Sequence, residues 1–214
     1  MLPGGVPGVQ AGRAVVIGAG VSGWSATQIA VGMGFHVTLL DKDVNKLREA
    51  DKVFGTKVQT IVSNAYQLER AVLAADLVIG AVLVPGAKAP VLVPDALVAR
   101  MKPGSVLVDI AIDQGGCFES SRPTTHSQPT FPVAGSVFYC VANMPGAVPH
   151  TSTWALTNVT LPYAVALADA GWRAAAGGDA ALAAGLNTAG GAVVNAPVAQ
   201  AHGLPFHRLS TASS

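Results

Sequence analysis

The sequence predicts an α/β fold with a doubly wound parallel sheet, and two observations lead to this prediction. Runs rich in valine, isoleucine and leucine alternate with segments of helical character between residues 14 and 142. Such alternation favours parallel strands, because each intervening helix returns the chain to the same edge of the sheet. The first apolar run also leads directly into a glycine-rich turn at residues 18–23, with a helix-compatible segment behind it.

The first half of the chain predicts four strands separated by three helices. Each strand is a short apolar run, and each helix lies between polar or glycine residues that are typical of helix ends. In chain order we expect a strand at 14–18, a helix at 21–32, a strand at 36–40, a helix at 44–54, a strand at 57–62, a helix at 65–74 and a strand at 76–82. The last of these strands is continuously apolar, which indicates burial on both faces.

The second half predicts two further strands and a helical tail. Pro94 favours a short helix to Arg100, and strands follow at 106–112 and 137–142. The loop between them, 114–132, is long for a compact domain, so we expect it to have a function. Thr151 begins a helix that restarts at Pro162 and ends at Gly171, and short helices are expected after residue 174. We therefore expect one domain at 1–148 and a helical return segment at 149–214, which belongs to an incomplete second domain.

The glycine-rich turn predicts a dinucleotide-binding site of the Rossmann type. Gly18 allows the chain to turn sharply off the strand, Gly20 allows the backbone to approach a pyrophosphate, and Gly23 allows the helix to pack closely on the sheet. The phosphates are expected at the helix N-terminus.

Asp41 ends the second predicted strand, where the adenine ribose of a bound dinucleotide is expected. A carboxylate there accepts hydrogen bonds from the ribose hydroxyls and repels a 2′-phosphate, so it favours NAD over NADP. Lys42 softens this preference, and Lys46 reaches toward the ribose or phosphates in one interpretation and into solvent in the other. An alternative role for Asp41 is to help begin the next helix with Asp43.

Composition excludes several classes of function. The 214 residues carry a formal net charge of +1 without a basic block, so neither nucleic acid nor a membrane surface is an expected partner. No apolar run has the length of a membrane-spanning helix, and the first residues do not resemble a signal peptide, so we expect a cytoplasmic protein. Cys117 and Cys140 are expected to be buried or loop thiols, and the histidine pattern predicts no metal site.

Ligands of open α/β sheets bind beyond the carboxyl ends of the strands, where the strand order reverses. This rule selects the glycine turn, Asp41, Ser63, the pair Val82 and Leu83, Asp113, and the pair Asn143 and Met144. Asp113 is the most reactive of these groups, because a carboxylate there can orient a substrate amine or relay a proton. It can also simply cap a loop. Asp109 is interpreted as structural, and Arg122 either clamps an anionic group or lies in solvent.

Four segments closely resemble the alanine dehydrogenase family: residues 80–90, 108–117, 121–126 and 139–145. They occur in the family's order, and the resemblance spans nearly the whole chain. It implies the NAD-dependent, reversible oxidative deamination of L-alanine to pyruvate and ammonia. Asp113 matches the family's catalytic aspartate. The implied cofactor contacts are Val21, Asp41, Lys46, Ser63, Val82, Leu83, Ile110, Ala111, Ile112, Asp113, Arg122, Val141, Ala142, Asn143 and Met144.

The resemblance also identifies departures from the family. Family members are considerably longer, so the substrate domain that carries the carboxylate-binding arginine and lysine and the catalytic histidine is expected to be absent. Ala170 stands where some members have a metal-binding histidine, so no metal is expected. The partner implied is a separate substrate-domain chain or a second copy in a homo-oligomer. The alternatives are the NAD-binding subunit of a proton-translocating transhydrogenase and a noncatalytic NAD-binding remnant.

Overall fold

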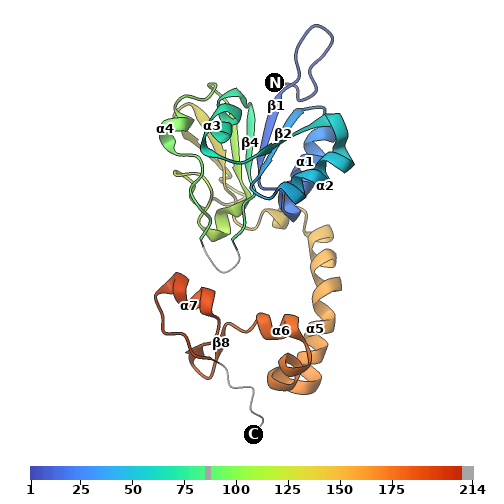
Figure 1. The fold of residues 1–214 in the computed structure, drawn as a ribbon, viewed down its shortest axis with the longest axis vertical. Coiled ribbons are helices and arrows are strands. Elements are labelled where there is room, and N and C mark those ends of the chain that lie inside the picture. The colour runs from blue at the N-terminus through green and yellow to red at the C-terminus, as the bar shows by residue number, and fades with distance from the viewer. Residues whose placement is uncertain (85–87, 209–214) are drawn as a thin grey trace. The chain divides into compact units, whose positions relative to one another are not determined.

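The computed structural model describes residues 1–84 and 88–208, and the chain forms two compact units. Residues 1–84 and 88–144 make the first unit, and the second begins at Pro145. The first is a mostly parallel sheet with helices on both faces, so the predicted fold class is confirmed (Figure 1). Residues 85–87, within the first of the four family-like segments, lie outside the described residues.

The seven-stranded sheet has the order β3-β2-β1-β4-β5-β7-β6. All neighbouring strands are parallel except the edge pair of β6 and β7. The order reverses between β1 and β4, which is where ligands bind in doubly wound folds. The strands are β1 (Arg13–Ile17), β2 (His36–Asp41), β3 (Val58–Val62), β4 (Leu77–Gly80), β5 (Val106–Asp109), β6 (Thr130–Val133) and β7 (Ser136–Tyr139).

Each face of the sheet has its own hydrophobic core, because alternate side chains of a strand point to opposite faces. From β1, Ala14 and Val16 pack with α1 and α2, whereas Val15 and Ile17 pack with α3 and α4. The helices are α1 (Val21–Gly32), α2 (Val44–Phe54), α3 (Ala65–Ala74) and α4 (Asp95–Val98). The first three have the predicted bounds.

Four predictions between β4 and β7 are corrected. The strand expected at 106–112 ends at Asp109, and residues Ile110–Gln114 form a 3-10 helix instead. The change occurs because the Asp109 carboxylate accepts the backbone N–H of Ala111, a donor that a continuing strand would use in the sheet. The expected loop 114–132 contains the beginning of β6, an edge strand that pairs antiparallel with β7. The strands expected at 76–82 and 137–142 are also shorter.

The second unit is mostly helical. Helix α5 (Pro149–Gly178) contains Pro162 and is interrupted at Gly171, whose φ of 71° is not helical. The predicted end at Gly171 is thus a kink, and the chain continues helically beyond it. Short elements follow, as α6 (Ala180–Ala184), the two-stranded pair β8 (Thr188–Ala189) and β9 (Ala192–Val193), and α7 (Ala196–His202). None of the described helices is long and apolar enough to cross a membrane.

Candidate functional site

The three glycines of the turn after β1 meet different surroundings. Gly18 has a φ of 105°, and a Cβ there would lie 2.6 Å from the carbonyl oxygen of Ala81. A Cβ at Gly23 would lie 1.8 Å from the carbonyl oxygen of Gly18, so α1 approaches the turn at backbone contact. In contrast, a Cβ at Gly20 would meet no atom within 4 Å. The fold therefore requires Gly18 and Gly23, whereas the open space beside Gly20 suits a ligand that approaches the backbone.

The N-terminus of α1 opens at the same place. Gly20 is the N-cap residue, and no side chain caps this helix. The first backbone N–H groups of a helix have no partner within the helix, and they carry its positive dipole end. Val21, the first helical residue, is 88% exposed. This end of α1 can therefore donate hydrogen bonds to a phosphate.

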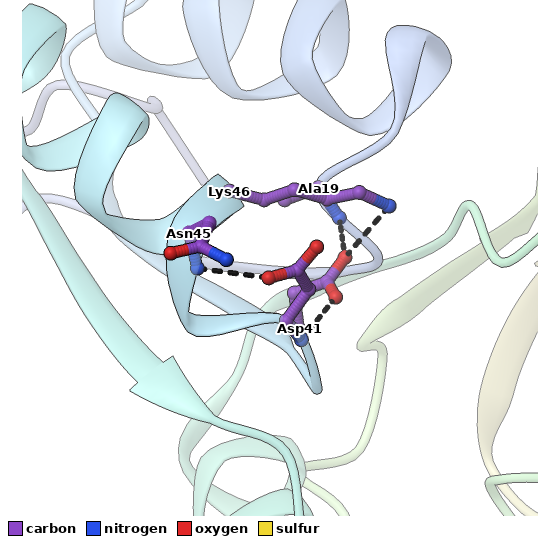
Figure 2. Close-up of polar contacts among 5 residues, drawn as sticks. Ala19, Asp41, Asn45 and Lys46 are labelled. Atoms are coloured by element: carbon purple, nitrogen blue, oxygen red, sulfur yellow. Dashed lines mark hydrogen bonds and ion pairs between the residues drawn. The ribbon is translucent and has the colours of Figure 1, made fainter.

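Asp41 connects this turn with the end of β2 (Figure 2). One carboxylate oxygen of Asp41 accepts the N–H of Ala19 at 2.6 Å, and the other accepts the N–H of Asp43 at 2.8 Å. Asp43 in turn caps α2 by accepting the N–H of Asn45 at 2.9 Å. The helix cap expected as an alternative role of Asp41 is thus made by Asp43, while Asp41 bridges the turn and the helix.

Lys46 and Ser63 lie beside Asp41. The Lys46 ammonium is 3.9 Å from an Asp41 carboxylate oxygen, and its side chain is half exposed. Figure 2 shows Lys46 extending from α2 across the carboxylate toward Ala19. The N–H of Ser63 donates to the backbone oxygen of Asp41 at 2.9 Å, which brings the end of β3 to this group. The predicted residues of β1, β2 and β3 therefore gather at one end of the sheet.

The second set of predicted residues follows β4 and β5. Gly80 and Asp109 are register partners at the ends of these strands, so Val82 and Ile110 both begin their segments at the carboxyl edge. Leu83 is 63% exposed, whereas Ala111 and Ile112 are buried. Asp113 lies in the 3-10 helix with an exposed side chain, which is accessible to a ligand. The structure thus moves Asp113 from the expected strand end to a short helix on the same edge.

The remaining predicted residues are Arg122, in the loop before β6, and the segment after β7. The guanidinium of Arg122 lies over the ring of Phe131, 4.2 Å from its centroid. Val141 is fully buried, and Asn143 adopts a φ of 56°, in the left-handed region. His126, which sequence reasoning did not select, places its Nε2 3.1 Å from the backbone oxygen of Asn143. That pairing joins residues 17 positions apart, so no local sequence signal indicates it.

The two cysteines are structural rather than reactive. Both are fully buried, which is one of the two states that the sequence predicts. Burial, with the nearby negative charge of Asp109, raises the pKa of the Cys117 thiol to about 12. Burial also raises the pKa of the Cys140 thiol. Since a thiolate is the nucleophilic form, neither cysteine is a candidate nucleophile near neutral pH.

The larger hollow of the first unit lies away from these residues. A hollow of about 760 Å³ lies between α3 and β1 to β3, but its lining includes neither the glycine turn nor Asp41. Among residues 1–84 and 88–208, no three histidine, cysteine or acidic side chains are grouped to hold a metal ion. The expectation that no metal binds stays a prediction.

Comparisons with known proteins show which family this chain resembles. The family described as "Alanine dehydrogenase/PNT, C-terminal domain" matches residues 1–196. Alanine dehydrogenase of Mycolicibacterium smegmatis is 61% identical over 206 residues, which are 96% of this chain and 56% of that protein. Alanine dehydrogenase of Geobacillus stearothermophilus is 54% identical over 207 residues, 96% of this chain and 55% of that protein. The chain thus spans about half the length of the curated relatives that it matches.

Solved structures give the same result. An L-alanine dehydrogenase superposes with a TM-score of 0.84 at 51% identity, over 94% of this chain and 56% of that one. A transhydrogenase from Sinorhizobium meliloti has a TM-score of 0.60 at 28% identity, over 67% of this chain and 41% of that one. By its match to the family model and its identity with these relatives, the chain belongs to the alanine dehydrogenase/PNT C-terminal domain family.

Proposed function

We propose that this chain binds NAD at the carboxyl edge of its sheet, as the cofactor-binding half of an L-alanine dehydrogenase. The observation that carries the proposal is the glycine turn, in which Gly18 and Gly23 are required by the fold while Gly20 faces open space. Asp41 beside that turn and the 61% identity with an alanine dehydrogenase support it further. When bound, NAD supplies the hydride acceptor for the oxidation of L-alanine to pyruvate and ammonia.

In this proposal the first set of residues holds the adenosine and the phosphates. The N–H groups at the start of α1 donate to the pyrophosphate, and Asp41 accepts from the ribose hydroxyls. Asp41 is 13% exposed and already accepts two backbone N–H groups, which orients its oxygens. Lys46 and Ser63 complete this part of the site. The charge of Asp41 repels a 2′-phosphate, so NADH binds more tightly than NADPH.

The second set of residues faces the nicotinamide and the substrate. Asp113 is the catalytic residue of the proposal, because its exposed carboxylate can orient the substrate amine or hold a proton on an oxygen. Val82, Leu83, Ile110 to Ile112 and Val141 to Met144 contact the cofactor, and Arg122 clamps an anionic group. The chain spans about half the length of its relatives, and we expect the grip on the substrate carboxylate to come from the other half of such a protein. Without that half, these 214 residues are not expected to deaminate alanine at family-like rates. The proposed partner is that other half, supplied by another chain, or a second copy of this chain. We also propose a cytoplasmic location.

Isothermal titration calorimetry with NADH tests the binding part of the proposal. Gly20→Ala adds a methyl group where the fold has room but the pyrophosphate approaches, so we expect affinity to fall by at least about tenfold. Gly32→Ala is the matched control, because it adds the same group to the other end of α1, also in open space. Equal affinities of the two variants, or no heat from either redox form with the unmodified chain, would contradict the proposal.

Reconstitution tests the enzymatic part. The chain is mixed with the separately produced amino-terminal part of a full-length relative, and NADH formation from L-alanine is followed by absorbance. Recovered activity that Asp113→Asn abolishes, with NADH affinity kept, supports a cofactor-binding half with Asp113 as catalytic residue. If the mixture forms no NADH from L-alanine although the chain still binds NADH, the result favours the noncatalytic NAD-binding remnant. The transhydrogenase alternative ranks lower, because that structure is 28% identical against 51% for the alanine dehydrogenase.

A further inference from the structure

Asp109, the last residue of β5, is a buried carboxylate outside the proposed contact set. It has 0% exposure and accepts four hydrogen bonds. One of its oxygens accepts the N–H of Ala111 at 3.1 Å. The other accepts the N–H groups of Cys117 and Phe118 at 2.7 and 3.3 Å, and the hydroxyl of Ser121 at 2.5 Å. All four donors belong to the loop that follows β5, so this one carboxylate closes that loop on itself.

The backbone around Asp109 is shaped to its carboxylate. Gly116 has a φ of 80°, and a Cβ there would lie 2.7 Å from the Asp109 oxygen and 2.6 Å from the Cβ of Ser121. Phe118 packs against Gly80, where a Cβ would lie 3.0 Å from its ring. The closed loop therefore rests directly on the end of β4, beside the turn to Val82.

The same loop is tied to the other segments of the second set. The Cys140 thiol donates to the Ser121 hydroxyl at 3.8 Å, and Ser121 donates onward to Asp109. The N–H of Thr124 donates to the oxygen of Cys140, and the N–H of Ala142 donates to the oxygen of Thr124. Asp109 thus stands at the centre of a connected unit that carries Asp113, Arg122 and the segment after β7.

We propose that Asp109 is the positioning residue of the nicotinamide side of the site. This inference rests on the proposed function. By closing the loop 110–121, Asp109 holds the backbone of the 3-10 helix that carries Asp113 and the start of the segment that carries Arg122. It has no part in the adenosine side, whose polar contacts run through Asp41.

An asparagine at this position cannot make the same contacts. Its side chain has one acceptor oxygen and one donor NH₂ group, whereas both sides of Asp109 face donors. Asp109→Asn therefore keeps the side-chain volume, but its NH₂ group faces a backbone N–H that one carboxylate oxygen of Asp109 accepts, so two donors oppose each other there. Ser121→Ala is milder, because it removes only the hydroxyl and leaves the three backbone donors on the carboxylate.

The experiment measures two ligands on each variant of the full chain by calorimetry. NADH reaches both sides of the site, and ADP-ribose lacks the nicotinamide. We expect Asp109→Asn to weaken NADH binding by about tenfold or more and ADP-ribose binding by less than about threefold. Ser121→Ala should shift the ratio of the two affinities in the same direction by about threefold. Amide hydrogen exchange of Ala111 and Cys117 should accelerate in Asp109→Asn, while that of Ala19 is unchanged.

Asp76→Asn is the matched control. Asp76 also accepts a backbone N–H, from Arg13 at 2.8 Å, but at the opposite ends of the strands, so the affinity ratio should not change. The inference is overturned if Asp109→Asn and Ser121→Ala keep the affinity ratio of the unmodified chain. It is also overturned if these variants lose affinity for NADH and for ADP-ribose equally. Should Asp109→Asn fail to fold, the ratio in Ser121→Ala decides alone. If the unmodified chain binds neither ligand, the proposed function fails and the inference fails with it.

Discussion

The two units of this chain differ in how completely they bury their apolar side chains. In the first unit, both faces of the sheet are covered, and large residues such as Phe138 and Leu39 are fully buried. In the described part of the second unit, only Ala175 and Ala199 are buried, while Trp154 and Leu156 of α5 are each 62% exposed. Because burial of apolar surface drives folding, the first unit contains its own source of stability and the second does not. The chain thus combines a self-sufficient domain with a helical segment whose apolar surface is left uncovered.

Truncation should show the largest difference in stability between the two units. A chain ending at residue 148, the predicted end of the first domain, should unfold cooperatively and bind NADH within about threefold of the full chain. A peptide of residues 149–214 should show no cooperative transition, because its described residues bury almost nothing. Thermal melts followed by circular dichroism measure both. A cooperative melt of the peptide, or loss of folding in the shortened chain, would contradict the difference between the units.

Aromatic truncations should show the same difference within the full chain. Phe138→Ala removes a fully buried ring that packs against Phe118 and Phe131, and it should cost about 3–5 kcal/mol of unfolding free energy. Trp154→Ala removes a larger but exposed ring and should cost less than about 0.5 kcal/mol. Urea titration provides the measurement. Similar losses for the two variants would mean that α5 packs more than its exposure indicates.

Glycine substitutions should show that the two units also differ in how closely their backbones pack. Gly23→Ala places a methyl group 1.8 Å from the oxygen of Gly18, so the first unit should lose about 2–4 kcal/mol as α1 shifts. Gly177→Ala in α5 is the matched control, because the added group meets nothing within 4 Å. It should be neutral or stabilising, since alanine favours helix more than glycine does. If the urea concentration at the unfolding midpoint decreases by the same amount in Gly23→Ala and Gly177→Ala, the close packing at Gly23 is contradicted.

The smallest expected effect depends on pH. Burial opposes ionisation of Asp76, but hydrogen bonds from Lys102 and the Arg13 N–H, with their positive charges, outweigh it and lower the pKa of this carboxyl. A lowered folded-state pKa stabilises the protein above the unfolded pKa, and this contribution disappears as pH falls through the folded pKa. Asp76→Asn should therefore cost about 1 kcal/mol at pH 7 and progressively less below about pH 4. A difference in melting temperature that is independent of pH would rule out this origin.

Much of the fold follows from local signals that the sequence displays. Helices α1 to α3 have their predicted bounds, because the signals that begin them are local: the side chains of Asp43 and Asn64 cap α2 and α3, and the glycine turn leads into α1. The residues selected by the strand-end rule lie at the carboxyl edge, because a parallel sheet aligns the ends of its strands. Strand β6 was not predicted, because Thr130–Val133 contains a proline and pairs only as an edge strand with β7.

The doubly wound sheet, the glycine turn and the acidic end of β2 can be predicted from the sequence, because hydrophobic periodicity and glycine conformation act over a few neighbouring residues. The end of β5 and the exposure of Asp113 depend instead on tertiary contacts. The apolar residues Ile110 to Ile112 are compatible with a longer strand. They leave the sheet because the buried Asp109 carboxylate binds donors as far as Ser121, and such a contact exists only once the loop has closed.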